Sequence, residues 1–252
     1  MPLTATQLLS TAYATTQQLS PLLLKAIDAG QTESVKSLLP QTPLSQYQTD
    51  DLLSYAVGKG QAPIVELLFS NGGSVDANFL GSLLHVAIVR GREQVVEILL
   101  KRGADINTKH HLSDATPLMT AIMANLATAV RIPMVTQLLN HGANPNITSC
   151  GVAPLFAAMT AAHLEPAHSE QIVELLLKHG ANVNTTNLGM TPLMVAVGLG
   201  RPKIVKLLLD HKADIAITLK TPQGRDVTAL DMAKVSNKTG CFALLEQAAQ
   251  KK

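Results

Sequence analysis

The chain has 252 residues and a net charge of +2, and 46% of its residues are apolar although only 3% are aromatic. The near balance of charge argues against nucleic acid or a membrane surface as partner, and a core built from Leu, Ala, Val and Ile favours packed helices over sheets. Cys150 and Cys241 lie far apart without a CxxC pair, which argues against a disulfide framework or a zinc module and fits a reducing compartment.

The first segment, TATQLLSTAYATTQQL (residues 4–19), places apolar residues such as Leu8, Leu9 and Tyr13 at helical spacing. This spacing predicts a capping helix over residues 1–19. The segment lacks the basic start and the continuous apolar block of a signal peptide. No stretch approaches the roughly 18 apolar residues that would span a bilayer. We therefore expect a cytoplasmic, intracellular protein.

One motif recurs along the rest of the chain. Each copy begins with a Leu that is followed three residues later by Ala, and a second apolar block such as VVEILL or IVKLLL comes after it. The marker leucines are Leu23, Leu53, Leu84, Leu118, Leu155, Leu193 and Leu230. They predict repeats near residues 20–50, 51–81, 82–115, 116–152, 153–190, 191–227 and 228–252.

The sixth copy indicates how each unit should fold. Thr191 and Pro192 suit the start of a helix, because Thr caps free N–H groups and Pro has no N–H to leave unpaired. Leu193 and Ala196 share one helical face, and Gly200 ends this first helix. The block IVKLLL repeats the helical spacing on a second helix. One unit is therefore a helix, a turn, a second helix and an extended, hairpin-like link.

The combination of TPL-x-x-A, two short helices, a closing LL-x-x-GA[DN]-x-N and a period near 33 resembles the ankyrin repeat family. The most complete copies lie at 82–107, at 191–215 and between them. The resemblance implies an all-α solenoid of stacked helix-turn-helix units, here one continuous domain over 20–252 with degraded end repeats. Only repeat 3 keeps the family's His after the marker Leu, as His85, so the hairpin hydrogen bonds of the other repeats should differ.

Repeats 4 and 5 are longer than repeat 3 by five and six residues between their two helices. The added residues lie near NLATAVRIP (125–133) and AHLEPAHSE (162–170). We expect these segments to project side by side from one edge of the stack. Neutral loop drift and a functional edge both remain open, since surface loops tolerate insertion well.

The chain carries no pattern of an enzyme. It contains no GxSxG elbow, no glycine-rich phosphate loop and no reactive cysteine context. The HLEPAH stretch (163–168) lacks the HExxH spacing of a metal site, and the group of His110, His111 and Asp114 belongs to a predicted hairpin. We therefore expect no catalytic residue, no cofactor and no bound metal.

By resemblance, such a stack binds a partner protein through a concave surface made of hairpin tips and first-helix faces, which we call the hairpin/first-helix surface. Tyr47 and Phe79 stand out on it, because aromatic residues are scarce here and dominate binding hot spots. Packing of Phe79 beneath the adjacent hairpin is an equal alternative. The residues predicted to contact the partner are Tyr47, Lys59, Asn78, Phe79, Arg90, His110, His111, Leu112, Met123, Thr160, Asn187, Met190 and Leu199.

The leading functional hypothesis is a non-catalytic adaptor, scaffold or inhibitor. The alternatives are the recognition or regulatory subunit of an enzyme complex, and a bacterial effector that binds host proteins in the host cytosol. We expect a monomer that binds a protein partner and neither nucleic acid nor a membrane. The resemblance also implies that Asn107 and Asn184, which close GA[DN]-x-N stretches, are candidates for asparaginyl hydroxylation.

Overall fold

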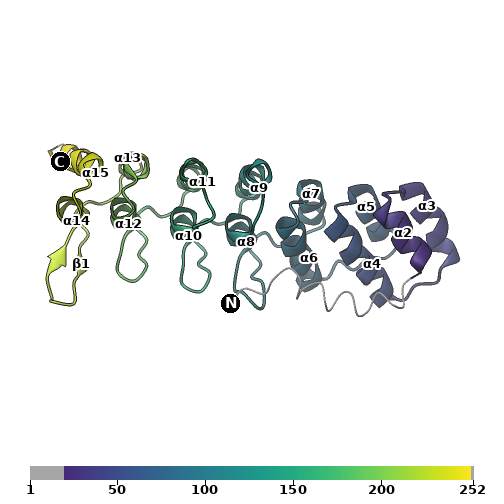
Figure 1. The fold of residues 1–252 in the computed structure, drawn as a ribbon. Coiled ribbons are helices and arrows are strands. Elements are labelled where there is room, and N and C mark those ends of the chain that lie inside the picture. The colour runs from purple at the N-terminus through teal and green to yellow at the C-terminus, as the bar shows by residue number, and fades with distance from the viewer. Residues whose placement is uncertain (1–19, 251–252) are drawn as a thin grey trace. The chain divides into compact units, whose positions relative to one another are not determined.

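The computed structural model describes residues 20–250 and is mostly helical, with long loops between the helix pairs (Figure 1). It divides into two compact units, one up to Met134 and the other from Val135 onward, with the boundary inside helix α9 (Thr128–Asn140). The predicted all-α architecture of stacked helix pairs is confirmed in both units. The predicted capping helix over residues 1–19 lies outside the described residues, and a single continuous solenoid remains a prediction.

Unit 1 is built from successive helix pairs, in which first helix packs on first helix and second on second. The pairs are α2 (Pro21–Asp28) with α3 (Thr32–Leu38), α4 (Gln46–Lys59) with α5 (Ala62–Ser70), α6 (Ala77–Val89) with α7 (Glu93–Lys101), and α8 (Pro117–Met123) with the start of α9. A short 3-10 helix, η2 (Leu39–Gln41), follows α3 at a proline.

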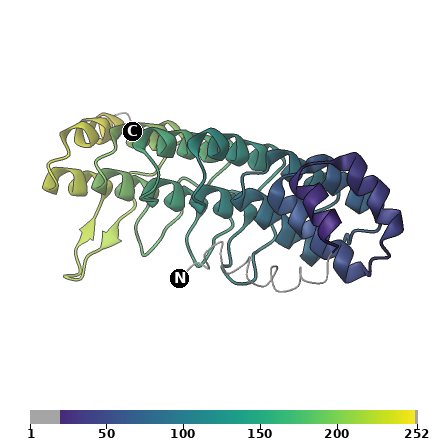
Figure 2. The ribbon, with the colours of Figure 1, turned by 45° about the vertical axis from the view of Figure 1, so that its right-hand side comes forward.

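Unit 2 continues with the end of α9 and three more pairs. They are α10 (Pro154–Thr160) with α11 (Pro166–Lys178), α12 (Pro192–Gly198) with α13 (Pro202–Asp210), and α14 (Ala229–Val235) with α15 (Thr239–Gln250). Long loops extend from the row of first helices on the side away from the second helices (Figure 2). The last of these loops is a hairpin in which β1 (Leu219–Lys220) pairs antiparallel with β2 (Asp226–Val227).

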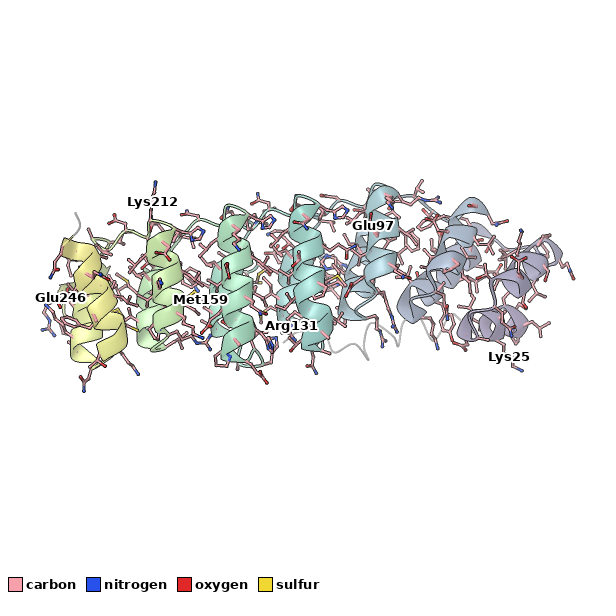
Figure 3. All side chains as sticks on the ribbon, turned by 90° about the horizontal axis from the view of Figure 1, so that it is seen from above. Lys25, Glu97, Arg131, Met159, Lys212 and Glu246 are labelled. Carbon is pink, nitrogen blue, oxygen red and sulfur yellow. The ribbon has the colours of Figure 1, made fainter. Side chains whose placement is uncertain are left out.

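The marker Leu and Ala form the core of the pairs, as predicted. On α6, Leu84 and Ala87 are fully buried, and the equivalent residues of the other inner pairs are buried as well. Met159 on α10 lies in the same buried layer (Figure 3). The marker Leu230 of the last pair is only half-buried, because the described chain has no further first helix to cover it.

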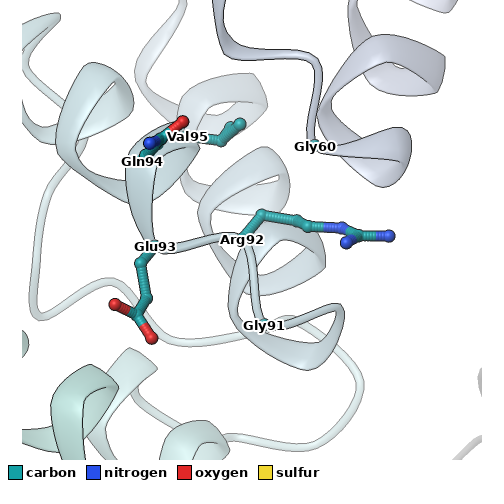
Figure 4. A pocket seen from close by; sticks show the side chains of 6 residues that line it. All are labelled: Gly60, Gly91, Arg92, Glu93, Gln94 and Val95. Atoms are coloured by element: carbon teal, nitrogen blue, oxygen red, sulfur yellow. The ribbon is translucent and has the colours of Figure 1, made fainter. Parts of the chain in front are cut away.

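In four of the five described pairs without an insertion, the first helix ends in a glycine turn, and in the last pair Asn237 takes the place of the glycine. Gly91 has φ +66°, and its N–H donates to the Ile88 carbonyl while that of Arg92 donates to the Ala87 carbonyl, which is the Schellman pattern. The Arg92 side chain then extends toward the preceding pair, where its Nε donates to the Gly58 carbonyl at 3.3 Å (Figure 4). The glycine turn at Gly91 therefore also positions Arg92, which links two pairs.

The insertions of repeats 4 and 5 do not form projecting loops, so that expectation was wrong. Helices α9 and α11 have 13 residues each, whereas α5, α7 and α13 have nine. Four of the five or six added residues therefore form an extra helical turn. The glycine turn is replaced by Ala124 and Ala161 in extended conformation.

Polar side chains within the extra turns hold these helices to the preceding segment. Arg131 on α9 is buried, and its guanidinium donates to the Ile122 carbonyl at 3.3 Å and to the Leu126 carbonyl at 2.7 Å. At the equivalent place on α11, buried Ser169 donates to the Ala158 carbonyl at 2.7 Å. A hydrogen-bonded extra turn is better ordered than the free loop that the sequence suggested.

The first helices α4 and α6 are also longer than expected, with 14 and 13 residues against seven in α8, α10 and α12. Ser45 starts α4 with a full capping box, and Asp76 caps α6 through two backbone N–H groups. Tyr47, Asn78 and Phe79 therefore lie in first helical turns and not at hairpin tips, which corrects the prediction.

Candidate partner-binding site

A polar pocket of about 220 Å³ lies in unit 1 between α6 and the loop that follows α7. It brings together three of the residues predicted to contact a partner, Asn78, His110 and His111. It also includes His85, which the sequence analysis considered only for the hydrogen bonds of the hairpins. The lining residues are Asn78, Gly81, Ser82, His85, Thr108, Lys109, His110 and His111.

Gly81 allows the loop to lie directly on α6. A Cβ atom at this position would be 2.9 Å from the Thr108 hydroxyl and 3.1 Å from its methyl carbon, closer than side chains normally approach. The φ of Gly81 is an ordinary helical one, so the glycine is needed for space and not for backbone conformation. The floor of the pocket therefore depends on a residue without a side chain.

His85 is buried at the back of the pocket. Its Nε2 lies 3.4 Å from the Thr108 carbonyl, which can only accept, so Nε2 carries the proton and Nδ1 accepts from the Thr120 hydroxyl at 2.9 Å. Burial, together with the neighbouring His110, lowers the pKa of His85 to about 4. The ring is therefore neutral near pH 7 and hydrogen-bonded on both sides.

His110 and His111 form the front of the pocket. The ring of His110 meets His85 edge-on with centroids 5.2 Å apart, and its centroid is 4.8 Å from that of His111. Burial and, to a smaller extent, the charge of His111 lower the pKa of His110 below its ordinary value. Three imidazoles thus lie in sequence from the protein interior to solvent.

Short-range hydrogen bonds hold the loop that carries these histidines. The His110 N–H donates to the Ala115 carbonyl at 2.9 Å, and the Ser113 hydroxyl lies 3.2 Å from His110 Nδ1. Lys109 Nζ donates to both carboxylate oxygens of Asp114, at 2.8 and 2.9 Å. The pocket is therefore formed before any partner binds.

The arrangement suits hydrogen bonding and not metal chemistry. Within residues 20–250, no three His, Cys, Asp or Glu side chains are grouped so that they could hold a metal ion. Both ring nitrogens of His85 already have protein partners. In the HLEPAH stretch, His168 Nδ1 lies 3.8 Å from Glu165 at the start of α11.

Comparison with known proteins decides the family. Three overlapping copies of the family model for ankyrin repeats match residues 22–110, 84–166 and 126–219. The chain belongs to the ankyrin repeat family. Ankyrin repeats are generally protein–protein interaction modules without catalytic activity.

A solved structure supports the same fold for this ankyrin repeat protein. The crystal structure of the human ASB11 ankyrin repeat domain is similar, with a TM-score of 0.61 and 24% identity, over 89% of this chain and 97% of that domain. None of the curated protein sequences compared with the chain matches it. In the described part of the chain, every helix is too short or too polar to cross a membrane.

The other predicted contact residues of unit 1 differ in exposure. Tyr47, in the first turn of α4, is 61% exposed, and Leu112, on the loop beside the histidines, is 57% exposed. Met123 is exposed at the end of α8, and Arg90 is exposed just after α6. Phe79 is half-buried, which is compatible both with partner contact and with packing beneath the adjacent hairpin.

Lys59 has a clear role within the ankyrin stack. Its ammonium pairs with Asp28 at the end of α2 and lies 5.0 Å from the ring centroid of Tyr55, whose hydroxyl donates to Asp28 at 2.7 Å. The hydrogen bond from Lys59 is the main cause that lowers the pKa of Asp28. This cluster joins two adjacent ankyrin repeats, so Lys59 contributes to packing.

In unit 2, the hairpin between α11 and α12 carries the most exposed apolar residue, which the sequence analysis missed. Asn187 and Met190, both predicted contacts, exchange two 3.0 Å hydrogen bonds and close a two-residue turn. Leu188 and Gly189 form that turn with φ +50° and +78°. Leu188 is 94% exposed. An Asn-Leu-Gly turn with an apolar tip was the signal that could have identified it.

The remaining predicted contacts of unit 2 follow first helices. Thr160 ends α10 and donates its hydroxyl to the Phe156 carbonyl at 2.8 Å, and Leu199 is exposed just after α12. Asn184 Oδ1 accepts from the Asp214 N–H at 2.8 Å, which joins two successive turns. Hydroxylation of Asn107 and Asn184 remains a prediction.

Proposed function

We propose that this ankyrin repeat protein is a non-catalytic protein-binding module, an adaptor, scaffold or inhibitor, that contacts its partner through the hairpin/first-helix surface. The observation that carries this proposal is the distribution of exposed apolar side chains. Among residues 20–250, every exposed large apolar residue belongs to a first helix or to the loop beside it, and none belongs to a second helix. They are Leu22, Tyr47, Val75, Leu112, Met123, Leu188, Leu199 and Val235.

The second helices present charged side chains to solvent instead. Glu97, visible on α7 in Figure 3, pairs with Lys101 at 3.3 Å, and Glu174 pairs with Lys178 at 2.7 Å. Single exposed apolar residues are normal on any protein, but none of those named above lies on a second helix, which favours the hairpin/first-helix surface as the one that binds. Charged ladders of this kind suit a face that stays in water.

The turn at Leu188 adds to this support. Its two central residues are both left-handed, as a type I′ turn requires, and Asn, Asp or Gly is favoured there over Leu. Leu gains no burial at 94% exposure and has a strained backbone. A residue that stabilises neither the turn nor the core is more easily explained by contact with a partner.

The test is affinity capture from cell extracts on immobilised full-length chain, followed by mass spectrometry. The binding variant is Tyr47→Ala with Leu112→Ala and Leu188→Ala, and the matched control is Lys101→Ala with Lys178→Ala on exposed second-helix positions. We expect a protein that the wild type and the control capture and that the triple variant loses. Capture that the control loses and the triple variant keeps would place binding on the second helices. A stoichiometric enzyme among the captured proteins would favour the regulatory-subunit alternative.

A further inference from the structure

The polar pocket of unit 1 offers mainly hydrogen-bond donors. Asn78, Lys109, His110 and His111 all carry N–H groups at its rim, and His85 closes its inner end. No carboxylate belongs to the described residues that line it. The nearby Asp114 accepts from Lys109 through both of its oxygens and so balances the charge of that lysine.

The size and chemistry of the pocket restrict what can enter. A volume of about 220 Å³ accommodates one side chain and not a folded segment. An apolar group would cover these donors without satisfying them, which costs free energy, and a basic group would find no carboxylate among the lining residues. A carboxylate accepts several hydrogen bonds at once and forms the strongest of them with charged donors.

We propose that this pocket receives the carboxylate of an Asp or Glu side chain from the partner protein, with His110 and His111 as its main donors. The inference rests on the proposed function, because it names the group that the partner presents to the hairpin/first-helix surface. His85 has no direct part in it, since its ring nitrogens bond to Thr108 and Thr120.

The same geometry links binding to protons. Charging His110 is opposed by burial and by His111, and a carboxylate that accepts hydrogen bonds from both rings would offset both effects. The other titratable groups near this site are His85 on α6 and the Lys109–Asp114 pair on the loop, while α8 contributes the uncharged Thr120. On the far side of α6, α4 carries Asp50, which accepts from the Ser74 N–H, and the neighbouring Asp51. Binding should therefore strengthen as the pH falls.

The test uses the full chain and a small probe, N-acetyl-glutamate N′-methylamide, with the isosteric glutamine compound as control. Histidine Cε1–H resonances are followed by NMR at constant ionic strength, up to about 50 mM probe. We expect saturable shifts of His110 and His111 with the glutamate compound and none with the glutamine compound. The dissociation constant should be at least about threefold larger at pH 8 than at pH 6.5.

Two variants assign the response. His110→Asn with His111→Asn should abolish saturable binding of the probe, and His141→Asn, at an exposed histidine of unit 2, should leave it unchanged. Equal responses to both compounds, no response, or an equal response to inorganic phosphate would overturn the proposal. Because no partner protein is used, these outcomes are independent of the capture experiment that tests the proposed function.

Discussion

Nδ1 of His85 lies 2.9 Å from the hydroxyl oxygen of Thr120, so one hydrogen bond joins α6 to α8 across two successive repeats. The opposite ring nitrogen faces the Thr108 carbonyl at the start of the histidine loop. A single neutral imidazole therefore holds two first helices and the loop between them. The native state is therefore more stable while that ring is uncharged.

This dependence predicts a specific loss of stability in acid. The pKa of His85 is about 4 in the folded chain, whereas an exposed histidine of the unfolded chain has a pKa of 6.5. As the pH falls, the unfolded chain therefore takes up the proton first. The contribution of neutral His85 to the free energy of unfolding is on the order of 3 kcal/mol. It is fully present above about pH 6.5 and is lost as the pH falls toward 4. Urea unfolding of wild type and of His85→Gln across this range measures it. The variant should be less stable at pH 7 with a flatter profile, and parallel profiles would contradict the assignment.

A second prediction concerns the close contact of Gly81 with Thr108. In an exposed helix Gly→Ala would stabilise by about 1 kcal/mol, but here the new methyl group overpacks the loop, which typically costs about 1–3 kcal/mol. Gly81→Ala should therefore destabilise the wild type and stabilise the Thr108→Ala variant. A double-mutant cycle by urea unfolding gives the coupling. Additive effects would mean that the loop does not rest on α6 as the structure has it.

Helix α11 offers a matched pair of neighbouring leucines. Leu176 is fully buried, whereas Leu175 is half-exposed. Leu176→Ala should cost about 2–5 kcal/mol through lost burial and a cavity, and Leu175→Ala clearly less. Glu174→Ala, which removes the ion pair with Lys178, should cost only about 0.2–0.5 kcal/mol. Equal losses in denaturant unfolding would show that the core face has been assigned wrongly.

The helix pairs were predictable because each repeat encodes them locally. A Thr-Pro start such as Thr191-Pro192, a Leu and Ala on one face, and a glycine turn such as Gly200 all act within a few residues. The extra helical turns of α4 and α6 had equally local signals in Ser45 and Asp76, but the family's spacing placed hairpins there instead. The expectation failed because capping outweighed the repeat pattern.

The pocket was not predictable in the same way. Asn78, His110 and His111 were chosen separately as variable positions, and their meeting depends on the contact of Gly81 with Thr108, 27 positions along the chain. The exposure of Leu188 could not be predicted from the sequence either, because it depends on the conformation of the hairpin turn and not on the residue type. Tertiary packing decides both.

A fourth prediction separates stability from binding at the hairpin of unit 2. Leu188 has a left-handed backbone, which Asn tolerates better than Leu, and its exposed side chain gains nothing from burial. Leu188→Asn therefore relieves strain without loss of core packing. The variant should be as stable as the wild type or more stable by up to about 1 kcal/mol, and it should bind the captured partner more weakly. Thermal unfolding and a binding assay on the same preparations test this. A less stable variant with unchanged affinity would indicate that Leu188 serves the fold.

The most direct test of binding through the hairpin/first-helix surface is the dissociation constant of the purified partner for three forms of the chain. These are the wild type, Tyr47→Ala/Leu112→Ala/Leu188→Ala, and Lys101→Ala/Lys178→Ala. All three should unfold at similar denaturant concentrations, because the changed side chains are exposed. We expect the triple variant to bind at least about tenfold more weakly, since buried apolar anchors dominate interfaces, and the lysine variant to bind within about twofold of wild type. Unchanged affinity in the triple variant together with a large loss in the lysine variant would contradict binding through the hairpin/first-helix surface.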